Sequence, residues 1–209
     1  MIPPRISPGD ADALLFDLGH VVLDIDFSKA IACWAGHAGR EPSDIAARFI
    51  VDETFRHHET GKISDADFFQ GVRHSLGVDL TDAQLLEGWN AIFAGEMPGM
   101  APLLARAAKR LPLYVFSNTN NAHAEYFSVI HADVLGHFRE IFLSSSIGLR
   151  KPDAEAYDHV VKSIGLPAGR IVFFDDLAEN VESARARGLK AVHVTSSGDV
   201  ADALTALGL

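Results

Sequence analysis

Four apolar runs along this chain are followed by polar residues whose types suit phosphate chemistry. Asp17 follows the first run, Ser117 and Asn118 follow the second, and the pair Asp175 and Asp176 follows the fourth. Carboxylate oxygens are the ligands that a hard cation such as Mg2+ prefers, and this ion keeps waters or substrate phosphate in its remaining positions. A hydroxyl and an amide can donate hydrogen bonds to phosphate oxygens.

Lys151 adds the positive charge that such a site requires. It lies between Arg150 and Pro152, in the loop after the third run. A carboxylate that faces phosphorus can act as a covalent nucleophile when a metal ion and a lysine reduce the charge repulsion between them. Together, these residues predict metal-assisted phosphoryl transfer.

Each of these residues also has a structural explanation when it is considered alone. Asp17 could cap the turn after its strand, and Ser117 with Asn118 could form an ordinary turn. Lysines in loops are usually solvated, and Asp175 with Asp176 could form a helix N-cap. Because all four stretches occur in one chain, each after an apolar run, the catalytic interpretation is favoured.

The elements that must position these residues form an α/β pattern. Short apolar runs favour buried strands over amphipathic helices. We expect strands at 14–16, 113–116, 141–143, 171–174 and 191–194, with helices between them, for example at 154–164 and 178–187. Such alternation predicts a doubly wound parallel sheet, a Rossmann-like core, with helices on both faces. The carboxyl ends of its strands meet in one crevice, where ligands bind.

A long helical segment separates the first two predicted strands. Asp17 and Ser117 are 100 positions apart, whereas a crossover with its helix usually needs about 30 residues. Helices are expected to begin at capping residues in this segment, namely Ser28, Ser43 or Asp44, Ser64 and Thr81. We therefore expect a catalytic core at 1–26 and 96–209, with a helical cap (lid) at 27–95 inserted above the crevice.

Four stretches of the predicted core resemble, in order, the four motifs of the haloacid dehalogenase-like hydrolases. They are Asp17-Leu18-Gly19, Phe116-Ser117-Asn118-Thr119-Asn120, Arg150-Lys151-Pro152 and Phe173-Phe174-Asp175-Asp176-Leu177-Ala178-Glu179-Asn180. The likeness extends into the predicted cap, where 55–64 and 88–93 resemble a bacterial α-D-glucose-1-phosphate phosphatase group. As a set, the ordered motifs are much more specific than any one of them.

The resemblance implies a metal site with assigned ligands. Asp17 is then the nucleophile that becomes an aspartyl phosphate, and it also binds Mg2+. The backbone carbonyl of Gly19 and the carboxylate of Asp176 complete the protein ligands. Asp175 is a supporting or water-mediated partner, and Asn180 orients these groups.

The resemblance also implies how the phosphoryl group is held. Ser117 and the backbone amide of Asn118 bind it, and Lys151 neutralises its charge. The expected enzyme is a Mg2+-dependent phosphatase of a small phosphorylated metabolite, such as the sugar phosphate α-D-glucose 1-phosphate.

Gly19 departs from the pattern of most phosphatases of this superfamily, which carry a second aspartate there as general acid and base. General acid catalysis typically contributes about 10²–10⁴-fold, so we expect activity to fall steeply as the pKa of the leaving group rises. His20, or His57 and His58 from the predicted cap, could supply the proton and contact the substrate. His57 and His58 are adjacent and cannot share one helix face, which argues against a two-histidine metal site. A surface role for both remains the simpler alternative.

Two other functions remain open at this point. A 2-haloacid dehalogenase uses an aspartate nucleophile without metal and also lacks the second aspartate, but the pair Asp175 and Asp176 argues against it. A catalytically impaired sugar-phosphate-binding protein is suggested by Gly19.

The composition limits the partners and the compartment. A formal net charge of −10 argues against a nucleic acid or an anionic membrane as partner. No apolar stretch is long enough to span a bilayer. Cys33 is the single cysteine, so no internal disulfide can form and the cytoplasm fits best. The chain could be a monomer or a homodimer.

Overall fold

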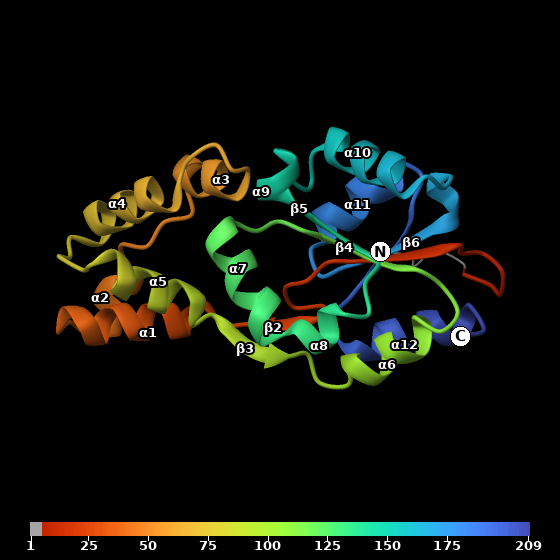
Figure 1. The fold of residues 1–209 in the computed structure, drawn as a ribbon, viewed down its shortest axis with the longest axis horizontal. Coiled ribbons are helices and arrows are strands. Elements are labelled where there is room, and N and C mark those ends of the chain that lie inside the picture. The colour runs from red at the N-terminus through yellow and green to blue at the C-terminus, as the bar shows by residue number, and fades with distance from the viewer. Residues whose placement is uncertain (1–5) are drawn as a thin grey trace.

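A five-stranded parallel sheet forms the centre of the molecule in the computed structural model, which describes residues 6–209 (Figure 1). The strand order is β5-β4-β1-β6-β7. The strands are β1 (Ala13–Phe16), β4 (Leu113–Ser117), β5 (Glu140–Leu143), β6 (Ile171–Asp175) and β7 (Lys190–His193). The predicted doubly wound parallel sheet is confirmed. Residues 1–5 of the predicted core lie outside the described residues.

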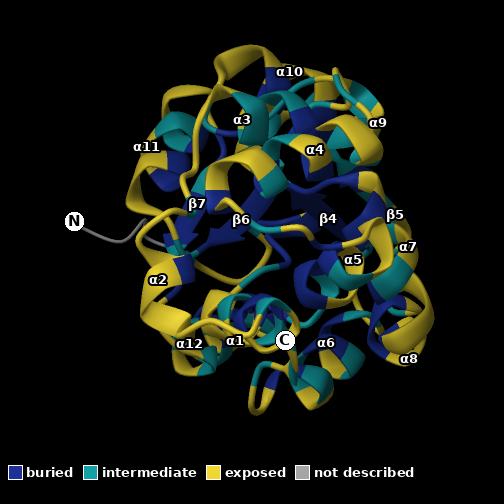
Figure 2. Ribbon diagram, turned by 90° about the vertical axis from the view of Figure 1, so that its left-hand side faces the viewer, coloured by how far each residue is buried: buried dark blue, intermediate teal, exposed yellow. Residues whose placement is uncertain are grey.

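The sheet is covered on both faces, which explains why its central strands read as continuous apolar runs. Successive side chains of β1 alternate between the faces: Leu14 and Phe16 belong to one apolar cluster, Ala13 and Leu15 to another. One face is packed by α6 (Met100–Ala107), α7 (Asn121–Ile130), α8 (Ala132–Leu135) and α12 (Ser197–Ala206), and the other by α10 (Ala154–Ile164) and α11 (Ala178–Ala186). Figure 2 shows the buried strands between these exposed outer surfaces.

Five helices lie in the segment predicted to be the cap. They are α1 (Phe27–Ala38), α2 (Pro42–Ala46), α3 (Glu53–Glu59), α4 (Asp65–Leu76) and α5 (Asp82–Asn90). The side chains of Ser64 and Thr81 cap α4 and α5, as predicted. None of the helices in the described part of the chain has the length and apolar character that crossing a membrane requires.

Two of the predicted helix starts are wrong. Asp26, not Ser28, caps α1, because its carboxylate accepts hydrogen bonds from the Ser28 amide and hydroxyl. Helix α2 begins at Pro42, whose fixed φ suits a first helical position, so neither Ser43 nor Asp44 precedes it as a cap.

A two-stranded antiparallel sheet joins the helical segment to the sheet domain. It pairs β2 (Leu23–Ile25), at the end of the predicted core segment 1–26, with β3 (Phe93–Glu96), at the predicted end of the cap. The sequence pattern predicts no strand at either place. Two further short elements, α9 (Ser144–Ile147) and the 3₁₀ helix η1 (Ala168–Arg170), follow β5 and precede β6.

The helical segment has an aromatic core of its own. The indoles of Trp34 and Trp89 stack with ring centroids 6.2 Å apart, and Phe68 packs 4.9 Å from Trp89. Both tryptophans are fully buried. These residues therefore hold α1, α4 and α5 together, as expected for cap core residues.

Candidate active site

Lys151 lies between two carboxylates at the carboxyl edge of the sheet. Its Nζ is 2.8 Å from Asp17 Oδ1 and 2.7 Å from Asp175 Oδ2. Asp17 follows β1, and Asp175 is the last residue of the neighbouring strand β6. The rings of Phe116 and Phe173 lie 5.3 and 5.5 Å from Nζ, so the ammonium group is shielded from water.

Burial and charge act together on this pair of side chains. Burial raises the pKa of Asp17 to about 7, the ammonium of Lys151 opposes this rise, and the charge of Asp175 adds to it. Burial disfavours the charge on Lys151, but the carboxylates of Asp17 and Asp175 together raise its pKa above the ordinary value. Lys151 is therefore a permanent cation beside a carboxylate that is poorly solvated.

The two oxygens of Asp17 differ in their surroundings. Oδ1 accepts hydrogen bonds from Lys151 Nζ and, at 2.7 Å, from the Leu18 amide. No hydrogen bond reaches Oδ2 from the residues that the structure describes. This oxygen is the one available to an incoming electrophile.

The loop that carries Lys151 is held by the residue that follows β4. Asn118 follows β4, and its side-chain amide donates to the Lys151 carbonyl and accepts from the Lys151 amide, both at 2.9 Å. The neighbouring Ser117 is buried and lines the same cavity. The family resemblance implies that the backbone amide of Asn118 binds phosphate, and the structure adds this two-point contact by its side chain.

The two adjacent aspartates after β6 differ in their contacts. Asp175 Oδ1 accepts from the Leu177 amide and from Asn180 Nδ2, both at 2.9 Å, while Oδ2 accepts from Lys151. Asp176 is half-buried and lines the cavity. Burial, followed by the charge of Asp175, raises the pKa of Asp176.

Three carboxylates are close enough to hold one cation. One oxygen from each of Asp17, Asp175 and Asp176 lies within 4.8 Å of the others. Since the oxygens of Asp175 already have partners, Asp17 and Asp176 are the two with donor capacity left. An all-oxygen set of this size fits Mg2+, which is usually bound by one or two carboxylates.

A cavity of about 270 Å³ opens in front of these residues. Of the predicted site residues, it is lined by Asp17, Gly19, His20, Ser117, Asn118, Lys151, Asp176 and Asn180. Asp175 lies behind Lys151 and is not part of the lining. The volume is near the lower end of the range for small-molecule sites, about 300–1,000 Å³.

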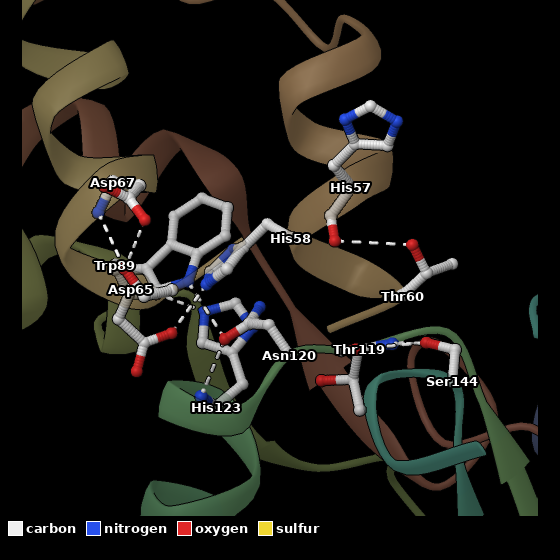
Figure 3. A network of polar contacts seen from close by, with 11 residues as sticks. His57, His58, Thr60, Asp65, Asp67, Trp89, Thr119, Asn120, His123 and Ser144 are labelled. Carbon is white, nitrogen blue, oxygen red and sulfur yellow. Dashed lines mark hydrogen bonds and ion pairs between the residues drawn. The ribbon is translucent and has the colours of Figure 1, made fainter. Parts of the chain in front are cut away.

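The structure does not bring His57 and His58 to this cavity. His57 projects from α3 toward Glu53, with 3.1 Å between its Nε2 and the carboxylate. His58 is buried against the Phe68 ring, and its Nε2 lies 2.6 Å from Asp65 Oδ1 (Figure 3). Of the three histidines considered as proton donors, only His20 lines the cavity.

The turn after Asp17 is tight and places His20 at the cavity edge. His20 has a φ of 55°, a left-handed conformation that is uncommon outside glycine. Its amide donates to the Leu23 carbonyl at 2.7 Å, which closes the turn. This backbone role is clear, whereas proton donation by His20 stays a prediction.

Two groups of cavity residues were not singled out from the sequence as site residues. Glu59, the last residue of α3, lies 3.0 Å from Arg150 and links the helical segment to the Lys151 loop. Its only sequence signal was its place beside His57 and His58. His123 and Asn120, at the start of α7, form a network with Trp89 of α5 (Figure 3). Asn120 is the N-cap of α7, which the sequence pattern can suggest. Its contacts with the Trp89 and His123 side chains have no further sequence signal.

Comparison with known proteins assigns the chain to a family. Residues 11–188 match the family model for haloacid dehalogenase-like hydrolase. A sesquiterpene phosphatase of Aspergillus oryzae is 32% identical over 152 residues, covering 71% of this chain and 76% of the relative. A D-ribitol-5-phosphate phosphatase of Bacteroides thetaiotaomicron is 23% identical over 199 residues, covering 93% of this chain and 97% of the relative.

A solved structure supports the same assignment for the fold. A crystal structure of a haloacid dehalogenase family enzyme from Bacteroides thetaiotaomicron, in complex with magnesium and inorganic phosphate, superposes with a TM-score of 0.78. It is 24% identical, and the alignment covers 89% of this chain and 95% of that one. Because the family model covers residues 11–188, which hold all four motifs, the chain belongs to the haloacid dehalogenase-like hydrolases.

Proposed function

We propose that this hydrolase is a Mg2+-dependent phosphatase of small phosphorylated metabolites that works through an aspartyl phosphate on Asp17. The observation that carries the proposal is the position of Lys151 Nζ, 2.8 Å from Asp17 Oδ1 in a water-shielded setting. A lysine there reduces the repulsion between a carboxylate nucleophile and a phosphate dianion. The match to phosphatase relatives supports the same reaction class.

Asp17, Asp176 and the backbone carbonyl of Gly19 are the proposed Mg2+ ligands. All three residues line the cavity, and two of them contribute to the cluster of carboxylates. When bound, the ion neutralises phosphate charge and orients the phosphoryl group. Asn180 and the Leu177 amide hold Asp175, which in turn positions Lys151.

The chain's own residues account for the remaining steps. Asp17 Oδ2 attacks phosphorus while Ser117, the Asn118 amide and Lys151 hold the phosphoryl oxygens. The bond from phosphorus to the alcohol oxygen breaks as the bond to Asp17 forms, and the departing oxygen takes a proton from His20 or from water. Water then attacks the acyl phosphate, which releases inorganic phosphate and regenerates the carboxylate. We propose that residues 27–95 act as a cap that excludes water in the first step, with the Glu59–Arg150 pair as its contact beside the site.

The substrate predicted from the sequence, α-D-glucose 1-phosphate, follows from the resemblance in the cap and from Gly19. An anomeric oxygen leaves more easily than an ordinary alkoxide, so this class tolerates a missing general acid. The relative that acts on D-ribitol 5-phosphate makes sugar phosphates a reasonable first group to assay. We propose that the enzyme acts in the cytoplasm, because its single cysteine, Cys33, fits a reducing compartment.

The test is phosphate release from a panel of phosphomonoesters with Mg2+ or with EDTA. Asp17→Asn is expected to lower kcat by at least about 10³-fold, as removal of a nucleophile does. The exposed Asp79→Asn is the matched control and should equal wild type. EDTA should abolish release and added Mg2+ should restore it.

Two results would redirect the assignment. Chelator-resistant release of chloride from chloroacids would indicate the metal-free dehalogenase. Tight sugar-phosphate binding without turnover would indicate the impaired binding protein. Equal activity of Asp17→Asn and wild type would refute Asp17 as nucleophile.

A further inference from the structure

We infer that the leaving group of the natural substrate is a compact apolar alcohol, so that the site binds a hydrocarbon phosphomonoester in preference to a sugar phosphate. This inference rests on the proposed phosphatase function and replaces the sugar phosphate predicted from the sequence with a hydrocarbon ester. The wall of the cavity beyond the phosphate-binding residues carries the argument. It includes the apolar side chains of Ile25, Phe27, Phe55, Phe93 and Leu177.

These apolar side chains come from both sides of the cavity. Phe27 begins α1, Phe55 belongs to α3 and Phe93 to β3, whereas Leu177 precedes α11 of the sheet domain. Phe27 is 38% exposed and Leu177 is 48% exposed, and both line the cavity. An apolar group seated between them would remove both from water.

Two polar side chains on the same wall, Asn120 and His123, already have partners. Asn120 donates to His123 Nδ1 at 3.0 Å and accepts from Trp89 Nε1 at 3.3 Å. His123 Nε2 lies 2.9 Å from the Trp89 carbonyl, so both ring nitrogens are engaged (Figure 3). Sugar hydroxyls in contact with this network would have to displace these bonds or remain unpaired.

Glu59 and Arg150 are the charged side chains that remain on this part of the lining. They neutralise each other across 3.0 Å, and the pair joins α3 to the Lys151 loop. The pair fixes this part of the wall, and among the described residues Glu59 Oε2 and Arg150 Nε are left without a hydrogen-bond partner, which gives at most two polar atoms for a substrate hydroxyl. The cavity of about 270 Å³ also limits the hydrocarbon to a compact group, which excludes a two-chain lipid.

The experiment measures binding of n-alkylphosphonates, which resist hydrolysis, to the Mg2+-loaded protein by calorimetry. Affinity should rise about fourfold per methylene, from about 0.8 kcal/mol per buried CH2, until the chain fills the cavity. Hexylphosphonate should bind at least about 50-fold more tightly than methylphosphonate. Glucose 1-phosphate and glucose 6-phosphate should each bind at least about tenfold more weakly than hexylphosphonate, as measured by competition with hexylphosphonate.

Two variants at the cavity and one outside it make the test specific. Phe27→Ser and Leu177→Ser should each reduce the gain in affinity per methylene. Because Phe27 belongs to the helical segment and Leu177 to the sheet domain, the test still holds if one of the two variants misfolds. Ile50→Ser replaces an apolar residue that is 65% exposed and absent from the lining, and should keep the wild-type gain.

The outcomes separate this inference from the proposed function. A chain-length series without a gain, no binding of hexylphosphonate, or tighter binding of glucose phosphates would overturn the apolar leaving group. A normal chain-length gain combined with no phosphate release from any ester would overturn the phosphatase and leave the apolar site supported.

Discussion

Acidification should destabilise the protein through His123, a buried histidine at the boundary between α5 and α7. Burial lowers its pKa to about 3, although a hydrogen bond to the Trp89 carbonyl opposes this shift. The ring stacks on Trp89 at 4.5 Å and has Phe93 at 5.1 Å. The charge of His58 also lowers the pKa of His123, and burial lowers the pKa of His58 itself.

The size and sign of the effect follow from the two states of this ring. A histidine whose folded pKa is lowered contributes stability that is present above its unfolded pKa, near 6.5, and is lost as the pH falls toward the folded value. Between pH 7 and pH 5 the unfolded ring gains a proton and the folded ring does not. The free energy of unfolding should therefore fall by about 2 kcal/mol from His123 alone.

Urea unfolding at pH 7 and pH 5, followed by tryptophan fluorescence, measures this loss. His123→Gln should be less stable than wild type at pH 7, by about 1–3 kcal/mol, because buried partners lose hydrogen bonds. Its further loss on acidification should be smaller than that of wild type by about 2 kcal/mol. The exposed His159→Gln should retain the wild-type difference. An equal loss in wild type and His123→Gln would refute the reasoning.

Three substitutions test the contacts around the site. Gly61→Ala should lower stability by more than about 1 kcal/mol, because Gly61 has a φ of 67° and an added Cβ would lie 2.5 Å from the Ser145 carbonyl oxygen. In Gly71→Ala, within α4, the added Cβ makes only an ordinary van der Waals contact, so stability should rise by about 0.5–1 kcal/mol. Thermal melts of the two glycine variants measure both changes. Asp175→Asn should lower phosphate release about 10–100-fold, because Lys151 loses one of its two carboxylates, and wild-type rates would contradict that role.

The sheet and its strand-end residues could be predicted because the signal is local. Each strand is a short apolar run, and the polar residues that follow it reach one edge whenever the strands are parallel. The structure accordingly brings Asp17, Ser117, Lys151 and Asp176 to one cavity. Their roles as nucleophile, phosphate ligands and metal ligand remain predictions.

The roles of neighbouring residues were harder to predict because they depend on side-chain direction. Nothing local distinguishes Asp175 from Asp176, yet one faces Lys151 and Asn180 while the other faces the cavity. His57 and His58 were considered for the cavity because of their chemistry. The direction of α3 instead turns one toward Glu53 and buries the other.

The two-stranded sheet of β2 and β3 could not be predicted because its strands are very short. Leu23–Ile25 has three residues and Phe93–Glu96 has four, one of them a glycine, so neither shows a clear alternation. Their pairing depends on partners about 70 positions apart in the chain. That pairing places Ile25 and Phe93 on the cavity wall. Because the two strands were not predicted, the contribution of these residues to the apolar wall was not predicted either.

Gly19 and the apolar wall act on the same atom of the proposed substrate. Because position 19 is a glycine, the loop has no carboxyl group there to protonate the departing oxygen. An apolar surrounding further disfavours the negative charge that develops there, because a charged form is less stable where solvation is poor. Both features therefore slow the departure of an alcohol of high pKa, while the apolar wall strengthens the binding of a hydrocarbon group. Leaving-group acidity and leaving-group hydrophobicity should for this reason be varied separately when substrates are compared.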